Sequence, residues 1–103
     1  MKYKVFVYGT LRDGAVRKTI LGFNPFSKPA SIKGFTMSSI LLEAISYPII
    51  IEDPLSNEII EGEYFEVDQE GIDNLDWYES TAYNRKEVYL ENGIRAWVYI
   101  KPK

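Results

Sequence analysis

An apolar segment that breaks into a glycine turn gives this chain its first sign of chemistry. Residues 5–12 read VFVYGTLR, in which Gly9 ends a stretch typical of a β-strand. Because glycine has no side chain, a ligand can approach such a turn closely, and the exposed backbone amides can hold an anion or a polarised carbonyl. A strand followed by glycine also occurs wherever a chain changes direction, so a second group is needed to indicate a site.

Glu79 is the candidate for that second group. On a helix over residues 69–79, positions 72, 75 and 79 are spaced by three and four, so Ile72, Leu75 and Glu79 project from one side. Burial on that side would raise the pKa of the carboxyl group toward neutrality, which suits a general acid and base. The alternative is that the helix frays near its end and Glu79 reaches water.

Tyr83 and Arg85 alternate onto one face of the strand that follows this helix. Few residues separate the helix from Tyr83, so both side chains are expected near Glu79, where they could orient it or contact a ligand. The alternative is a structural role, because tyrosines commonly pack their rings and arginines commonly form surface ion pairs. Asp76 is expected to be solvated or to accept a local hydrogen bond.

The chain contains no cysteine and no histidine. This composition excludes Ser-His and Cys-His nucleophile pairs, imidazole acids and bases, disulfides and ordinary zinc sites. We therefore predict no metal site, and in an enzyme proton transfer would fall to a carboxylate, a lysine or a tyrosine. The glycine patterns of phosphate-binding loops and dinucleotide sites are also absent.

The elements that must position these groups are short strands and two helices. Helices are predicted over residues 15–21 and 69–79, the second one capped by Asp68. Strands are predicted over residues 2–8, 31–37, 49–52, 59–67, 83–91 and 94–101. Gly62 marks either a bulge or a close approach of another backbone. This order predicts an α+β fold, a small mixed β-barrel with one or two short flanking helices around one core.

The final hairpin has the clearest turn signal in the sequence. Its strands are joined by Asn92-Gly93, the preferred pair for a two-residue type I′ turn. Counting back from such a turn places Val88 opposite Trp97, a good cross-strand pair.

Length and composition indicate one folded domain over residues 1–103. Hydrophobic residues make up 46% of the chain and charged residues 26%, values typical of an ordered globular protein. The net charge is -3 and no basic cluster occurs, so we expect no nucleic-acid partner. No apolar run approaches the roughly 20 residues of a membrane helix, and the first residues lack the pattern of a signal peptide. We expect no membrane association and a cytoplasmic location.

Several of these segments together resemble the γ-glutamylcyclotransferase-like (AIG2-like) family. The matching segments follow the family's order and span nearly the whole chain: residues 7–12, Tyr47-Pro48, residues 62–67, Leu75-Asp76 with Glu79, Tyr83 with Arg85, and residues 96–99. The resemblance implies a small mixed β-barrel and an enzyme that cyclises a γ-glutamyl amide or amine to 5-oxoproline and releases the free amine. It implies no cofactor.

The resemblance also implies roles for individual residues. Glu79 matches the family's catalytic acid and base, and the expected partner is a small γ-glutamyl molecule whose released amine the sequence does not identify. Tyr83 is a further candidate for contact with the substrate. The segment that lines the family's substrate pocket is matched by Tyr8, Gly9, Thr10 and Leu11.

The chain departs from the family pattern at Ser80, where glycine is common, and in its short linker to Tyr83. Both departures bear on the rim of the expected pocket and leave the glutamate in place. The alternative function is a protein of the same fold that binds a small ligand or a partner without catalysis. A third reading gives the glycine and tyrosine positions a role in chain geometry only.

Overall fold

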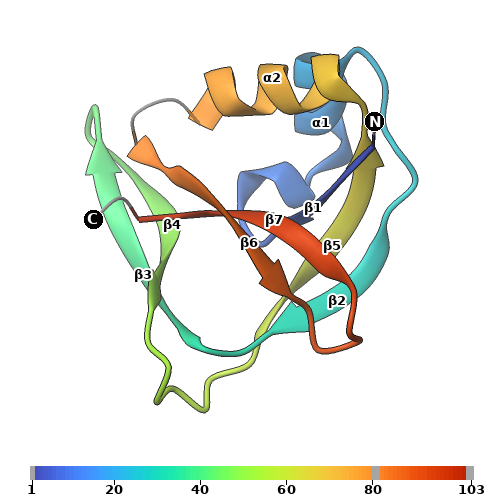
Figure 1. Ribbon diagram of the computed structural model, residues 1–103. Helices are drawn as coiled ribbons and strands as arrows, with labels where there is room; N and C mark the ends of the chain where they lie inside the picture. The colour runs from blue at the N-terminus through green and yellow to red at the C-terminus, as the bar shows by residue number, and fades with distance from the viewer. Residues whose placement is uncertain (1, 80–81, 102–103) are drawn as a thin grey trace.

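The computed structural model describes residues 2–79 and 82–101, and Figure 1 shows how their elements are arranged. The strands are β1 (Tyr3–Val7), β2 (Lys28–Ile32), β3 (Phe35–Leu42), β4 (Ile45–Glu52), β5 (Ile60–Val67), β6 (Asn84–Tyr89) and β7 (Arg95–Ile100). The helices are the 3-10 helix η1 (Thr10–Arg12) and the α-helices α1 (Gly14–Leu21) and α2 (Gln69–Glu79). No helix within the described residues is long and apolar enough to cross a membrane.

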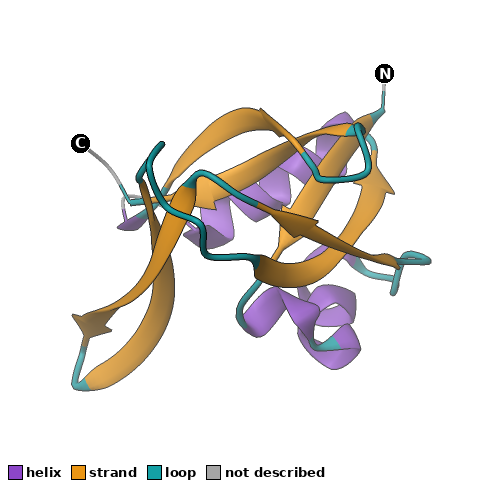
Figure 2. Cartoon of the chain, turned by 90° about the horizontal axis from the view of Figure 1, so that it is seen from below, coloured by secondary structure: helices purple, strands orange, loops and turns teal. Residues whose placement is uncertain are grey.

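Within these ranges, β1 lies at the centre of a mixed five-stranded sheet of order β2-β5-β1-β7-β6. Val5 of β1 lies opposite Phe65 in an antiparallel pair with β5 and opposite Trp97 in a parallel pair with β7. β3 and β4 form a separate hairpin, which curves away from the larger sheet in Figure 2. The mixed sheet with its flanking helices confirms the predicted α+β class, although the hydrogen-bonded pairs of the described strands do not close into a barrel.

Apolar side chains lie on both faces of the larger sheet. Phe6 packs on one face with residues of β2, β7 and the hairpin, whereas Val5 and Val7 pack on the other face with residues of α2. This division follows from strand geometry, because successive side chains point to opposite faces. Figure 1 shows α1 and α2 together on one side of the larger sheet, the side on which Val5 and Val7 pack. Because β1 is buried on both sides, the chain leaves the core in a fixed position at Tyr8 and Gly9.

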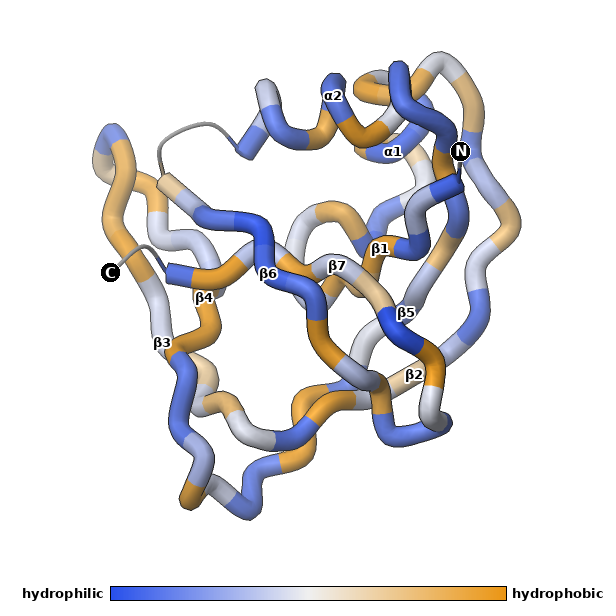
Figure 3. The backbone as a smooth tube through the Cα atoms, viewed as in Figure 1, coloured by the Kyte–Doolittle hydropathy of each residue, from blue (hydrophilic) through white to orange (hydrophobic). Residues whose placement is uncertain are grey.

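The bounds of α2 are those predicted from the sequence. Asp68 caps the helix, since its Oδ1 accepts a hydrogen bond from the Gly71 N–H at 2.9 Å. Ile72 and Leu75 are fully buried, and Figure 3 shows hydrophobic positions alternating with hydrophilic ones along the helix. Glu79 continues the stripe of Ile72 and Leu75, so α2 carries a carboxyl group on the side that faces the protein.

Gly62 is a point of close backbone contact, one of the two readings that its place in a strand allowed. A Cβ atom at this position would lie 2.1 Å from the carbonyl oxygen of Val7 and 2.8 Å from Cζ of Phe6. Real Cβ atoms do not come this near to other heavy atoms, so glycine lets β5 pass directly beside the end of β1. The contact lies just before Gly9 and η1, which together we call the Gly9 turn.

Between residues 31 and 52 the predicted strands are wrong in two respects: one of them is interrupted, and the hairpin that they belong to is longer than predicted. The predicted strand over 31–37 is broken by Gly34 at φ +88°, and its second half belongs to the longer hairpin of β3 and β4. The turn of that hairpin contains Glu43 and Ala44, whose φ angles are 51° and 65°. Residues other than glycine, asparagine and aspartate rarely adopt this conformation, so the usual turn signature is missing here.

The predicted register of the final hairpin is wrong by one residue, because Val88 lies opposite Ala96. The Leu90 N–H donates to the Ile94 carbonyl at 2.8 Å, so the loop between them holds three residues. Gly93 adopts φ +85°, as expected when a type I turn is followed by a glycine bulge. The asparagine-glycine pair therefore located the turn but did not give its length.

Candidate active site

A cavity of about 440 Å³ opens where the end of β1 meets the C-terminal end of α2 and the β3–β4 hairpin. It combines segments that are far apart in the sequence. Four segments form its walls: residues 6–11 at the end of β1 and beyond it, Leu42, Glu43, Tyr47 and Pro48 of the hairpin, Tyr78, Glu79, Ala82 and Tyr83 around the end of α2, and Tyr99 of β7.

Glu79 lines this cavity from the last position of α2 and is partly buried. Desolvation by burial raises the pKa of its carboxyl group from 4.5 to about 7. No described residue forms an ion pair with this carboxylate. The placement favours the sheltered reading of Glu79 over the solvated one, and a pKa near neutrality lets one group both accept and return a proton.

The raised pKa predicts that Glu79 makes the protein less stable as the pH rises from about 4.5 to about 7. In this interval the native state keeps the proton on Glu79 while the unfolded chain has released it, so the free energy of unfolding falls with increasing pH. The stability that protonated Glu79 contributes is fully present below its unfolded-state pKa of 4.5 and is lost above its folded-state pKa of about 7. Urea unfolding of wild type and Glu79→Gln across this range measures it. A difference between the two proteins that stays constant with pH would contradict the prediction.

Tyrosines surround Glu79 in the cavity wall. The hydroxyl of Tyr83 donates to the carbonyl of Pro48 at 2.9 Å, and that of Tyr8 donates to the carbonyl of Tyr99. Burial, with the nearby charge of Glu79 as a smaller cause, raises the pKa of Tyr83 to about 12. Burial also raises the pKa of Tyr8, and the charges of Tyr83 and Glu79 act in the same direction. Both phenols therefore stay protonated near neutral pH.

The Gly9 turn forms another wall of the cavity. The Arg12 N–H donates to the Gly9 carbonyl at 3.0 Å, and the Asp13 N–H donates to the Thr10 carbonyl at 3.1 Å. These two bonds close η1. Among the described residues, the amides of Thr10 and Leu11 donate to no other backbone group, as is usual for the first amides of a helix. They are available as hydrogen-bond donors.

Two contacts hold the Gly9 turn against the other walls. A Cβ atom at Gly9 would lie 2.8 Å from Cγ of Pro48, so the hairpin packs directly on the turn. Thr10 Oγ1 lies 3.3 Å from the hydroxyl oxygen of Tyr78 on α2, and either group can donate in this hydrogen bond. The turn, the hairpin and the end of α2 are thus joined around the cavity.

The structure brings all of the predicted site residues into the wall of this one cavity. They are Glu79, the candidate acid and base, and the candidate substrate-binding residues Tyr8, Gly9, Thr10, Leu11 and Tyr83. Their roles in binding and catalysis remain predictions.

Arg85 does not line the cavity. Of its two predicted roles, contact with Glu79 or a ligand and a structural ion pair, the structure shows the ion pair. Its Nε lies 3.3 Å from Oδ1 of Asp76, and its guanidinium lies 4.4 Å from the centroid of the Trp97 ring. Asp76 also accepts a hydrogen bond at 2.8 Å from the hydroxyl of Tyr99, the residue opposite Arg85 in the sheet. Asp76 therefore accepts a hydrogen bond, but the prediction of a local partner is wrong, because the donor lies on β7.

Sequence reasoning did not predict that Leu42, Glu43 and Tyr99 belong to the cavity wall. Tyr99 lies there because β7 pairs in parallel with β1, a long-range pairing that no local signal reveals. Leu42 and Glu43 lie near a turn without turn signature residues. Tyr47 and Pro48, which are part of the family resemblance, are the signal that could have drawn attention to this hairpin.

The fold and the cavity together define a small α+β protein with a sheltered carboxyl group facing a glycine turn. The family model described as gamma-glutamyl cyclotransferase, AIG2-like, matches residues 5–103. The chain therefore belongs to this family, as the sequence resemblance implied. Among curated proteins, none matches the chain significantly.

Solved structures share the fold. A protein from Arabidopsis thaliana is 25% identical with a TM-score of 0.80, and the match covers 97% of this chain and 68% of that one. An AIG2-like protein from Mus musculus is 22% identical with a TM-score of 0.72, covering 97% of this chain and 77% of that one. A gamma-glutamyl cyclotransferase is 14% identical with a TM-score of 0.79, and the match covers 100% of this chain and 68% of that one.

Proposed function

We propose that this protein is an enzyme that cyclises a γ-glutamyl amide or amine to 5-oxoproline and releases the free amine. The observation that carries the proposal is the single cavity shared by Glu79 and the Gly9 turn. Such a reaction needs a group that transfers protons and hydrogen-bond donors that stabilise charge around one bound substrate. Membership of the gamma-glutamyl cyclotransferase family supports the same class of reaction.

In the proposed reaction, the α-amine of the substrate attacks its own γ-carbonyl carbon. One carbon–nitrogen bond forms to close the five-membered ring, and the bond from the same carbon to the departing amine breaks. Glu79 takes one proton from the attacking amine and returns one to the departing amine, so the protons balance. Holding the substrate in the geometry for attack can contribute ~7 to 11 kcal/mol in favourable intramolecular cases. The nucleophile comes from the substrate itself.

Substrate binding is assigned in this proposal to backbone amides and phenols. The N–H groups of Thr10 and Leu11 would hold either the α-carboxylate of the γ-glutamyl group or the oxyanion that develops at its γ-carbonyl. Gly9 gives the substrate room to approach the backbone. Tyr8 and Tyr83, both fixed by hydrogen bonds to carbonyl groups, form the sides of the binding space.

Release of 5-oxoproline from a panel of γ-glutamyl compounds tests the proposal. The panel should include γ-glutamyl amino acids, a γ-glutamyl lysine side chain and γ-glutamyl polyamines. We expect 5-oxoproline and free amine in equal amounts from at least one class, with no added cofactor. Absence of release from every class would overturn the enzyme assignment, and stabilisation by 5-oxoproline in a thermal melt would then indicate a ligand-binding protein.

A further inference from the structure

Among the described residues, Arg17 of α1 is the one charged residue that is buried, with 5% of its surface exposed. It lies outside the cavity wall, and the proposed reaction makes no use of it. Burying a guanidinium is costly unless its charge is paired and its N–H groups are hydrogen-bonded. The contacts of Arg17 therefore show what its burial accomplishes.

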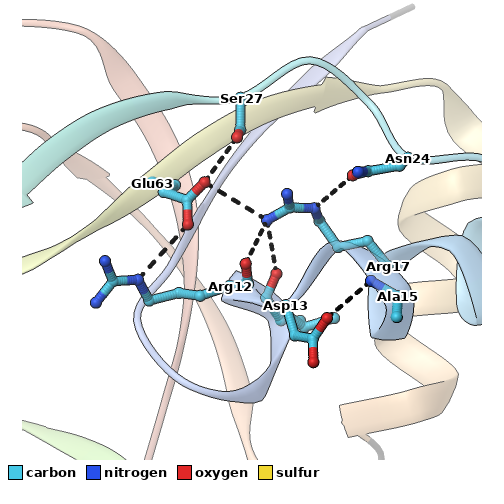
Figure 4. Close-up of polar contacts among 8 residues, drawn as sticks. Arg12, Asp13, Ala15, Arg17, Asn24, Ser27 and Glu63 are labelled. Atoms are coloured by element: carbon cyan, nitrogen blue, oxygen red, sulfur yellow. Dashed lines mark hydrogen bonds and ion pairs between the residues drawn. The ribbon is translucent and has the colours of Figure 1, made fainter.

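The guanidinium of Arg17 is directed at the turn that follows Gly9. Its Nη1 donates to the carbonyl oxygen of Leu11 at 2.9 Å and to that of Arg12 at 3.2 Å. Its Nε donates to Oδ1 of Asn24 at 3.0 Å. Figure 4 shows the guanidinium between Asn24, Glu63 and the turn. One buried cation thus binds two successive carbonyl groups of η1.

The counter-charge is Glu63 of β5. Its Oε1 lies 3.8 Å from Arg17 Nη1 and also accepts a hydrogen bond from Ser27 Oγ at 2.7 Å. Glu63 lies opposite Val7, the last residue of β1. The Arg17 guanidinium also lies 5.4 Å from the centroid of the Phe65 ring. Arg17 is therefore anchored to the central sheet while its Nη1 holds the turn.

Binding these carbonyls has a consequence for the hydrogen bonds that close η1. The Leu11 carbonyl and the Arg12 N–H belong to one peptide group, and this N–H donates to the Gly9 carbonyl. In the same way, the Arg12 carbonyl shares a peptide group with the Asp13 N–H, which donates to the Thr10 carbonyl. A cation at a carbonyl polarises its peptide group and strengthens the hydrogen bond that the N–H of that group donates. Arg17 thereby favours the closed turn, in which the Thr10 amide remains available as a donor.

We propose that Arg17 is a positioning residue, which acts through the Leu11 and Arg12 carbonyls to hold the Gly9 turn in its ligand-binding conformation. This inference rests on the proposed function. It differs from a general contribution to stability because it predicts an effect on substrate binding and turnover in protein that remains folded. It also predicts an effect, in the absence of any ligand, on the two amides whose hydrogen bonds close η1.

Kinetics of 5-oxoproline release with Arg17→Met and Arg17→Lys test the inference. Lys4→Met is the matched control, because Lys4 forms an ion pair with Glu66 at 3.8 Å that is exposed and remote from the turn. Hydrogen bonds to a charged donor are typically strong enough that their loss lowers kcat/KM about tenfold or more. We expect that loss for Arg17→Met, partial recovery for Arg17→Lys and no change for Lys4→Met. The kinetic pKa assigned to Glu79 should stay at its wild-type value.

Amide hydrogen exchange keeps the inference testable even if no substrate is turned over. In ligand-free Arg17→Met, the amides of Arg12 and Asp13 should exchange about tenfold faster than in wild type and Lys4→Met. If Arg17→Met does not fold, Arg17→Lys should show the same change to a smaller extent. Unchanged exchange in the folded variant, or a kcat/KM of folded Arg17→Met within threefold of wild type, would overturn the inference. If exchange is faster in the variant but wild type releases no 5-oxoproline, Arg17 still positions the turn. Only the proposed function would then be refuted.

Discussion

Replacing Glu79 with glutamine is expected to lower 5-oxoproline release at least about 100-fold, the usual contribution of a positioned acid and base. Glutamine has nearly the same size and can occupy the same place at the end of α2, but it can neither accept nor return the proton. The loss should appear in kcat, because both proposed proton transfers belong to the chemical steps. Steady-state assays of 5-oxoproline formation measure it.

Glu70→Gln is the matched control for this experiment. Glu70 belongs to the same helix and undergoes the same chemical change, but it is exposed in the first turn and does not line the cavity. Its variant should keep wild-type turnover. If Glu79→Gln folds and also keeps wild-type turnover, Glu79 is not the acid and base, and the proton must move by another route.

Gly62→Ala is expected to lower the free energy of unfolding by about 3 kcal/mol or more, at the upper end for overpacked sites. The new Cβ would lie 2.1 Å from the Val7 carbonyl oxygen, so backbone as well as side chains must move. Separation of β5 from β1 is the direct way to relieve this clash. Urea unfolding followed by circular dichroism measures the loss.

Gly93→Ala separates steric overlap from the general cost of removing a glycine. Gly93 has φ +85° in an open loop, and apart from its chain neighbours no atom of the described residues lies within 4 Å of the place that a Cβ would occupy. Alanine there should therefore cost only the strain of a left-handed residue, about 1–2 kcal/mol. If Gly62→Ala costs no more than Gly93→Ala, β5 does not pack against β1 as closely as the structure shows.

The parts of the fold that the sequence predicted well are those with local signals. The Asp68 cap and the buried positions Ile72 and Leu75 define α2 by themselves, because capping and helical spacing operate over a few residues. The strand that ends at Gly9 is similarly marked by its own composition. These two elements carry the candidate acid and the turn, so the residues of the site could be named before their meeting place was known.

Other parts depended on distant segments. Whether Glu79 is sheltered is decided by the hairpin and by Tyr8 and Tyr83, and the helical spacing alone left the solvated alternative open. The Glu43-Ala44 turn adopts positive φ without a favourable residue, so its hairpin was only partly predicted. Arg17 resembles any basic residue on a short helix, because the carbonyls and the carboxylate that surround it come from other elements.

Titration of the Glu79 carboxyl group by carbon-detected NMR tests the central claim most directly. We expect a pKa of about 7, because this side chain is desolvated in the cavity. The assignment follows from the resonance that disappears in Glu79→Gln. A pKa near the ordinary value of 4.5 would mean that the carboxyl group is solvated, and would contradict the role given to it here.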